Sequence, residues 1–192
     1  YIELPSIFPT SKGLLITSEK SGFNQLYLID LKSGSKALTQ GHSPVSEVFG
    51  HGDKYIYYSK INFPSPDRLI YKTTFQGVNS VISNSEGYHS AEISANSQYL
   101  FETYSTKETP PIQQIINAKG DVVKLINDNT QLQYQLEQIN LPLLKKGIFI
   151  NSNKDTLAYE LLLPSRFDSS INYPTIIHTY GGPGYQIIKN KY

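Results

Sequence analysis

The hydrophobic positions of this chain fall into short runs that repeat, with polar turns between them. Residues 13–41, "GLLITSEKSGFNQLYLIDLKSGSKALTQG", alternate apolar runs with clusters of Gly, Ser and Asn, which are hairpin signals. Residues 53–84 and 97–128 follow the same plan. Their last apolar residues, Leu38, Ile82 and Ile126, follow one another at intervals of 44 residues. Several short strands repeated at about this period are typical of β-propeller blades.

The pattern therefore predicts a mainly β fold, with blades of an incomplete β-propeller over residues 1–129. A β-sandwich with coincidental spacing is the alternative. A propeller closes with about 4–8 blades. Three repeats thus predict a chain that lacks part of the ring, or an open array.

The pattern changes after Asn129. In residues 130–140, "TQLQYQLEQIN", Leu132, Leu136 and Ile139 have helical spacing, and Thr130 is a candidate N-cap. We expect a linker helix over residues 130–141, followed by a second domain over residues 142–192. Two strands around an Asn-Lys-Asp turn are expected in residues 147–168, and a third at Thr175–Ile177, where the β-branched run suits a strand of an α/β sheet.

Composition narrows the functional classes. The 192 residues carry a formal net charge of +1, which predicts no binding of nucleic acid. No apolar run approaches the roughly 20 residues of a membrane span. The sequence has no Cys, so it offers neither a disulfide framework nor thiolate chemistry.

The motifs of common active sites are absent. Neither a GxxxxGK[ST] phosphate loop nor a GxGxxG fingerprint occurs, and no G-x-S-x-G nucleophile elbow is present. "GHSPV" at residues 41–45 comes nearest to an elbow, which makes Ser43 a weak nucleophile candidate. The four histidines, His42, His51, His89 and His178, lack metal-ligand spacing, and we expect them at the surface or at strand edges. No metal and no cofactor are expected.

Five segments, in order, resemble one known family. They are "SEKSGFNQLYLID" (residues 18–30), "PSPDRLIY" (64–71), "EGYHSAEISANSQYLFETYSTKETPP" (86–111), "LLLPSRFDSSINYP" (161–174) and "YPTIIHTYGGPGYQ" (173–186). They are similar to segments of the prolyl oligopeptidase family of serine peptidases, in its dipeptidyl-peptidase IV branch. Phe23 stands where that family usually has Trp, and "PSPDRLIY" is one residue short.

The resemblance implies that residues 142–192 begin an α/β-hydrolase catalytic domain. It also implies that Tyr180, in the "YGGPG" turn, donates its hydroxyl to the oxyanion hole. His178 lies two positions before Tyr180, on the same face of the expected strand. The family's Ser, Asp and His follow the point where this sequence ends, so no triad residue is assigned here.

The activity implied is that of a serine exopeptidase releasing N-terminal dipeptides, Xaa-Pro or Xaa-Ala, from peptides with a free N-terminus. The family's acidic pair for that N-terminus is absent, since no Glu-Glu occurs. The chain is therefore expected to be a middle fragment of a parent enzyme. The parent enzyme is expected to form a homodimer and to lie in the periplasm or cell envelope of a bacterium. A non-catalytic propeller that binds partners, and an acylaminoacyl-peptidase or esterase, stay open as alternatives.

Overall fold

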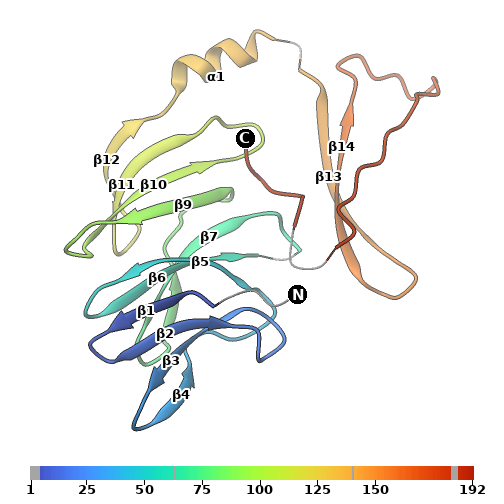
Figure 1. Ribbon diagram of the computed structural model, residues 1–192. Coiled ribbons are helices and arrows are strands. Elements are labelled where there is room, and N and C mark those ends of the chain that lie inside the picture. Colours follow the sequence, from blue (N-terminus) through green and yellow to red (C-terminus); the bar gives the residue numbers. More distant parts are fainter. Residues whose placement is uncertain (1–4, 63, 140, 183–185) are drawn as a thin grey trace. The chain divides into compact units, whose positions relative to one another are not determined.

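The computed structural model describes residues 5–62, 64–139, 141–182 and 186–192, and it divides into two compact units. The first unit comprises residues 1–128 together with residues 190–192, and the second comprises residues 129–189. Fourteen strands and one helix are formed by the described residues (Figure 1). None of the described helices is long and apolar enough to cross a membrane.

The strands of the first unit form a four-stranded sheet and an eight-stranded sheet. The larger sheet consists of two successive antiparallel groups of four, so three groups of four follow one another along the chain (Figure 1). The first group is β1 Ile7–Thr10, β2 Gly13–Ser18, β3 Gln25–Asp30 and β4 Gly34–Ala37. The second is β5 Val45–His51, β6 Tyr55–Ile61, β7 Arg68–Thr74 and β8 Asn79–Val81. The third is β9 Tyr88–Ile93, β10 Tyr99–Ser105, β11 Ile112–Asn117 and β12 Val122–Asn127.

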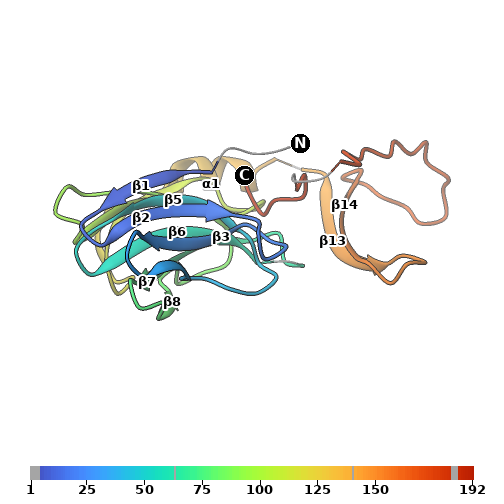
Figure 2. The same ribbon diagram turned by 60° about the horizontal axis from the view of Figure 1, so that its bottom comes forward.

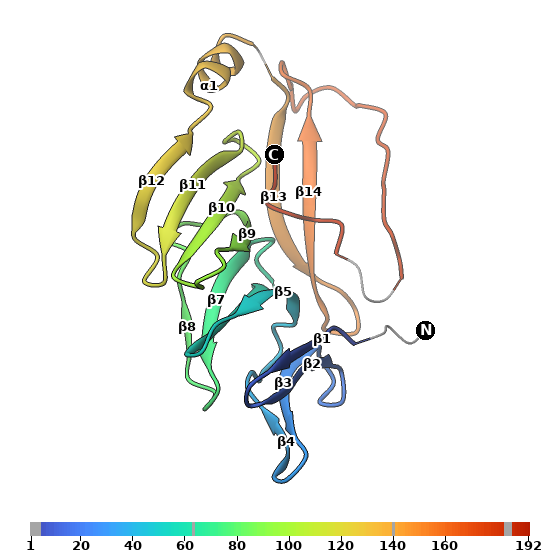
Figure 3. The same cartoon turned by 60° about the vertical axis from the view of Figure 1, so that its left-hand side comes forward.

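Within each group the strands pair in sequence order, as hairpin connections dictate. The second and third groups also meet through a parallel pairing of Arg68 with Tyr88, so that β9 lies beside β7 (Figure 3). The repeat seen in the sequence has a structural basis, because Leu38 and Ile82 each follow the fourth strand of a group and are buried. Ile126 lies in β12 and is 47% exposed.

Two apolar clusters hold the three groups together. The first contains Leu15, Leu26, Leu28, Leu38, Val45, Ile56, Tyr58 and Phe75, from the first and second groups. The second contains Tyr57, Ile70, Ile82, Leu100 and Ile116, from the second and third groups. Each fully buried aliphatic side chain contributes about 1.5–3 kcal/mol relative to exposure. Burial of the apolar faces is therefore the main stabilising interaction of this unit.

Strand β6 lies between the two clusters, which explains its unbroken run of buried residues. Tyr57 and Tyr58 are neighbours in sequence, so their side chains point to opposite faces of the strand. Tyr58 joins the first cluster and Tyr57 the second. The Tyr58 hydroxyl donates to Asn79 Oδ1 at 2.6 Å, and the Tyr57 hydroxyl donates to the Ser97 carbonyl at 3.1 Å. Burial raises the pKa of both phenols, so both remain donors at neutral pH.

The second unit contains the helix α1 Thr130–Glu137 and the hairpin of β13 Leu143–Ile150 with β14 Thr156–Leu163. The two strands pair along their whole length and curve together (Figure 2). The predicted N-cap is corrected by one residue. Asn129, with φ 53°, holds the cap position, and Thr130 is the first helical residue. Asn tolerates this left-handed backbone better than Thr does, because Thr is β-branched.

The strand predicted at Thr175–Ile177 is not formed. Residues 172–181 have no regular secondary structure, and Ile176 and Ile177 are 95% and 87% exposed. A β-branched run favours an extended backbone, but a strand also requires a hydrogen-bonded neighbour. In the described chain no strand pairs with this run. The prediction from local composition was therefore wrong for this structure.

The same five-residue turn closes two hairpins, at Asn117–Asp121 and at Asn151–Asp155. In each, the asparagine Oδ1 accepts from two backbone N–H groups of the turn, and its Nδ2 donates to the aspartate carboxylate. The fourth residue of each turn has positive φ, 91° at Gly120 and 68° at Lys154. Glycine adopts this conformation freely, whereas a residue with a Cβ is strained there.

We expect Gly120→Ala to destabilise the first unit strongly. A Cβ on Gly120 would lie 2.2 Å from the Ile82 carbonyl oxygen, in addition to the strain of its positive φ. Gly34→Ala is the matched control, because Gly34 has φ 83° but no atom within 4 Å of such a Cβ. Thermal melting should show a loss of about 1 kcal/mol for the control and at least ~1 kcal/mol more for Gly120→Ala. Equal losses would contradict the steric argument.

Lys154→Gly should stabilise the β13–β14 hairpin. Relief of a left-handed lysine is worth about 1–2 kcal/mol, and the added chain entropy of glycine offsets about 0.5–1 kcal/mol of it. The expected net gain of about 0.5–1 kcal/mol is measured by chemical denaturation. Asn153→Gly is the control, since Asn153 does not have positive φ and glycine there brings only the entropic cost. A loss of stability in Lys154→Gly would refute the analysis.

Candidate functional site

Tyr180 lies at a turn whose glycines are required by geometry. Gly181 adopts φ 65°, which a residue with a Cβ rarely does. A Cβ on Gly182 would lie 2.8 Å from the Tyr180 ring, so the ring packs over the bare backbone of that glycine. Tyr180 is 56% exposed. The turn therefore presents a phenol, a hydrogen-bond donor, at an accessible position.

Among the described residues, neither the His178 ring nor the Ser43 hydroxyl has a hydrogen-bond partner that would make it catalytic. His178 is exposed and lies in the same irregular segment, so the strand face predicted to carry both residues is not formed. Ser43 is half-buried, and its carbonyl accepts from Gln25 Nε2 at 3.2 Å. Within the described ranges, no hydrogen bond joins the Ser43 hydroxyl to a histidine. The hydrogen bonds from Gln25 fix the loop that contains Ser43, which is consistent with a structural role for this serine.

The histidines divide into two kinds. His42 is exposed and packs on Phe23, with ring centroids 5.3 Å apart, and the partly exposed His51 Nε2 lies 3.0 Å from the Pro9 carbonyl oxygen. His89 differs, because it is only 1% exposed. The prediction that all four lie at the surface or at strand edges was therefore wrong for His89. In the described part of the chain, no three His, Asp or Glu side chains converge as metal ligands.

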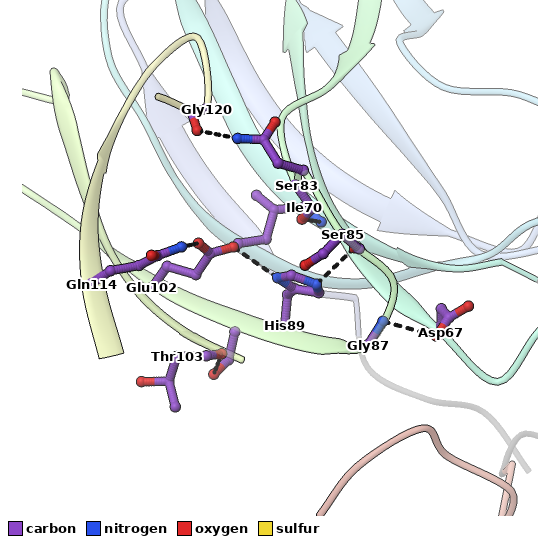
Figure 4. A network of polar contacts seen from close by, with 12 residues as sticks. Asp67, Ile70, Ser83, Ser85, Gly87, His89, Glu102, Thr103, Gln114 and Gly120 are labelled. Carbon is purple, nitrogen blue, oxygen red and sulfur yellow. Dashed lines mark hydrogen bonds and ion pairs between the residues drawn. The ribbon is translucent and has the colours of Figure 1, made fainter. Parts of the chain in front are cut away.

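His89 is the centre of a buried polar network in the third group of strands (Figure 4). Its Nδ1 lies 2.8 Å from Glu102 Oε1, and its Nε2 lies 3.1 Å from the Ser85 carbonyl oxygen. Glu102 Oε2 accepts from Gln114 Nε2 at 2.7 Å. The network thus joins β9, β10 and β11 and the loop that precedes β9.

The hydrogen-bond partners limit the protonation of this pair. The Ser85 carbonyl only accepts, so Nε2 donates to it. Nδ1 and the Glu102 carboxylate then share one proton, and the pair carries no net charge whichever atom holds it. The His89 ring also stacks on the Tyr104 ring, with the ring centroids 4.9 Å apart and an interplanar angle of 9°. A neutral, fully bonded pair packed against an aromatic ring is suited to a structural role.

Arg68 forms a second polar cluster, at the start of β7. It is 8% exposed, its Nε donates to Ser59 Oγ at 3.0 Å, and its Nη1 donates to the Tyr88 hydroxyl at 3.0 Å. Its Nη2 pairs with the Glu47 carboxylate. These partners come from β5, β6 and β9, so one guanidinium joins four strands.

The loop that leads into β7 contributes a buried carboxylate. Asp67 is 7% exposed and accepts from the Gly87 backbone N–H at 2.9 Å and from Asn190 Nδ2 at 2.7 Å (Figure 4 shows the contact with Gly87). Ser65 also donates its hydroxyl to Asp67. Sequence reasoning did not identify Asp67 or Asn190, because they lie 123 positions apart and neither belongs to a motif of known chemistry.

The three groups of strands and the order of the five resembling segments agree with comparisons to known proteins. The dipeptidyl peptidase IV (DPP IV) N-terminal region matches residues 3–111. A probable dipeptidyl peptidase 4 of Aspergillus flavus is 27% identical over 181 residues, covering 91% of this chain and 24% of that protein. Dipeptidyl peptidase 4 of Trichophyton tonsurans is 26% identical over 183 residues, with the same coverage. The chain thus spans about a quarter of the length of the curated relatives it matches.

Solved structures give the same result for the fold. The crystal structure of Porphyromonas gingivalis dipeptidyl peptidase 4 superposes with a TM-score of 0.87 at 27% identity, over 97% of this chain and 27% of that one. A putative dipeptidyl aminopeptidase IV from Bacteroides ovatus superposes with a TM-score of 0.82 at 22% identity, which supports the fold alone. The predicted propeller blades are confirmed. The match to the dipeptidyl peptidase IV N-terminal region covers more than half of the chain. This protein therefore belongs to the family of the dipeptidyl peptidase IV N-terminal region.

Proposed function

We propose that this chain is part of a serine exopeptidase that releases N-terminal dipeptides, with Xaa-Pro and Xaa-Ala as the preferred ends. The support comes from relatives named dipeptidyl peptidase 4 that cover nine-tenths of the chain. The proposed division assigns residues 1–129 to the last propeller blades, 130–141 to a linker and 142–192 to the start of an α/β-hydrolase domain. The nucleophile, acid and base would then be supplied by residues beyond this sequence.

Tyr180 is the proposed oxyanion-hole donor. The observation that carries this assignment is the turn itself, where Gly181 has positive φ and the Tyr180 ring lies against the backbone of Gly182. When a hydroxyl attacks the scissile carbonyl, negative charge develops on the carbonyl oxygen. A donor already in place for that oxygen stabilises the transition state more than the ground state. One such donor is typically worth about 3–4 kcal/mol.

The Tyr180→Phe variant of the parent enzyme tests the assignment. It keeps the ring over Gly182 and removes only the hydroxyl, so the fold should persist. We expect kcat to fall about 10²–10³-fold, with a much smaller change in KM. Tyr173→Phe is the matched control, because Tyr173 lies in the same segment and its hydroxyl accepts from the Asp168 backbone N–H at 3.0 Å. A Tyr180→Phe enzyme with normal kcat and a lower melting temperature would make Tyr180 a packing residue.

The requirement for a free N-terminus is tested with paired peptides. We expect the parent enzyme to cleave an Ala-Pro reporter and to leave the same reporter acetylated at its N-terminus intact, because acetylation removes the positive charge that an exopeptidase of this type must bind. The readout is kcat/KM for each peptide of the pair. Preference for the acetylated peptide would favour an acylaminoacyl-peptidase instead. Absence of cleavage of either peptide would favour a non-catalytic propeller.

A further inference from the structure

Asn190 lies ten positions after Tyr180, yet its side chain is built into the first unit. It is 6% exposed, and its backbone N–H, its Nδ2 and its Oδ1 each have a hydrogen-bond partner in that unit. Its backbone N–H donates to the Pro66 carbonyl at 3.0 Å and its Nδ2 to Asp67 Oδ1 at 2.7 Å. Its Oδ1 accepts from the Lys107 backbone N–H at 3.2 Å. An asparagine held by three polar contacts is a specific anchor.

The two residues that follow Asn190 extend this anchor. The Tyr192 backbone N–H donates to Ser105 Oγ at 3.2 Å, and Lys191 Nζ lies 5.4 Å from the centroid of the Tyr88 ring. The partners belong to the loop before β7, to β9, and to the end of β10 with the loop after it. The anchor therefore spans the second and third groups of strands.

Asp67 is the residue on which this anchor depends. A buried carboxylate is costly unless donors surround it. Asp67 has donors from three segments, namely Ser65, Gly87 and Asn190. Gly87 has φ 134°, and a Cβ there would lie 2.7 Å from the Ser105 carbonyl oxygen, so only glycine allows the loop to bring its N–H to Asp67. Two of the three donors to Asp67 thus come from segments next to β7 and β9 and do not depend on Asn190.

We propose that the pair Asp67–Asn190 is a clamp by which the propeller positions the turn that carries Tyr180. The proposal rests on the proposed function of Tyr180, and both residues of the pair are positioning residues. A fully extended stretch of ten residues spans at most about 36 Å, and anchoring one end removes much of its freedom. Misplacement of a catalytic group by about 1 Å can cost about 10²-fold in rate. Fixing one end of the segment is therefore of direct catalytic value.

Four single variants of the parent enzyme separate hydrogen bonding from charge. Asp67→Ala removes the acceptor, Asn190→Ala removes the donor, and Asn190→Asp places a second carboxylate against Asp67. Each should lower kcat by about 10–100-fold, with a much smaller change in KM. Asp67→Asn should keep kcat within about threefold of the wild-type value, because its Oδ1 still accepts from Gly87 and Asn190 while its Nδ2 donates to Ser65. The control is Asn24→Ala, which removes an amide hydrogen bond at 2.8 Å to the Val45 carbonyl and should not change kcat.

Two further measurements complete the test. Hydrogen exchange at the backbone amides of Asn190 and Tyr192 should be slow in the wild-type and Asp67→Asn enzymes and fast in the other three variants. In a Tyr180→Phe background, Asn190→Ala should lower kcat by less than about twofold, because both substitutions act on the same donor. Asn190→Ala, which alters only the docked residue, keeps the test valid if Asp67→Ala fails to fold.

The outcomes are distinguishable. If Tyr180→Phe lowers kcat but Asn190→Ala does not, the clamp is refuted and the proposed function stands. If Asp67→Asn is as impaired as Asp67→Ala, the charge and not the hydrogen bond matters, and the clamp is refuted. If the effects of Asn190→Ala and Tyr180→Phe multiply independently, Asn190 does not act through Tyr180. If Tyr180→Phe has normal kcat, the proposed function fails, and the clamp as a positioning device fails with it.

Discussion

The packing of one four-stranded group on the next is the constraint on which the first unit depends. A group of four short strands has too little area to bury its own apolar residues, so each group needs a neighbour. Strand β6 shows the consequence most clearly, because Tyr57 and Tyr58 are consecutive and yet enter two different apolar clusters. A strand with one exposed face would alternate between apolar and polar residues.

The same packing explains why the first unit holds buried polar groups. Where sheets are pressed together, a polar side chain loses water and must find a partner inside. His89 finds Glu102 and the Ser85 carbonyl, and Arg68 finds Ser59, Tyr88 and Glu47. These bonds are directional, whereas apolar contacts are not. They therefore help to define the register and spacing of strands that hydrophobic burial alone would leave less determined.

The polar groups differ in what they can contribute to function. The His89–Glu102 pair is enclosed, stacked on Tyr104 and neutral as a whole, which suits a fixed internal link. Asp67 lies in the loop directly before β7, and one of its donors, Asn190, comes from far along the sequence. A carboxylate that accepts from a distant segment connects the propeller with the chain that follows the Tyr180 turn. In the proposed function, this contact is where the first unit restrains the chain that follows Tyr180.

The sequence by itself predicted the repeat and its propeller blades, because hairpin periodicity is a local property of the chain. The family was indicated by the resemblance of five ordered segments. The sequence also singled out Tyr180 as a candidate, because the glycines of its turn are adjacent to it, and that assignment stays a prediction. It failed at Thr175–Ile177, because strand formation depends on a partner that composition does not reveal. It failed at His89, whose partner Glu102 lies on the neighbouring strand. Only the tertiary structure brought Asp67 to Asn190, because contacts between residues 123 positions apart arise from the path of the folded chain and leave no local pattern.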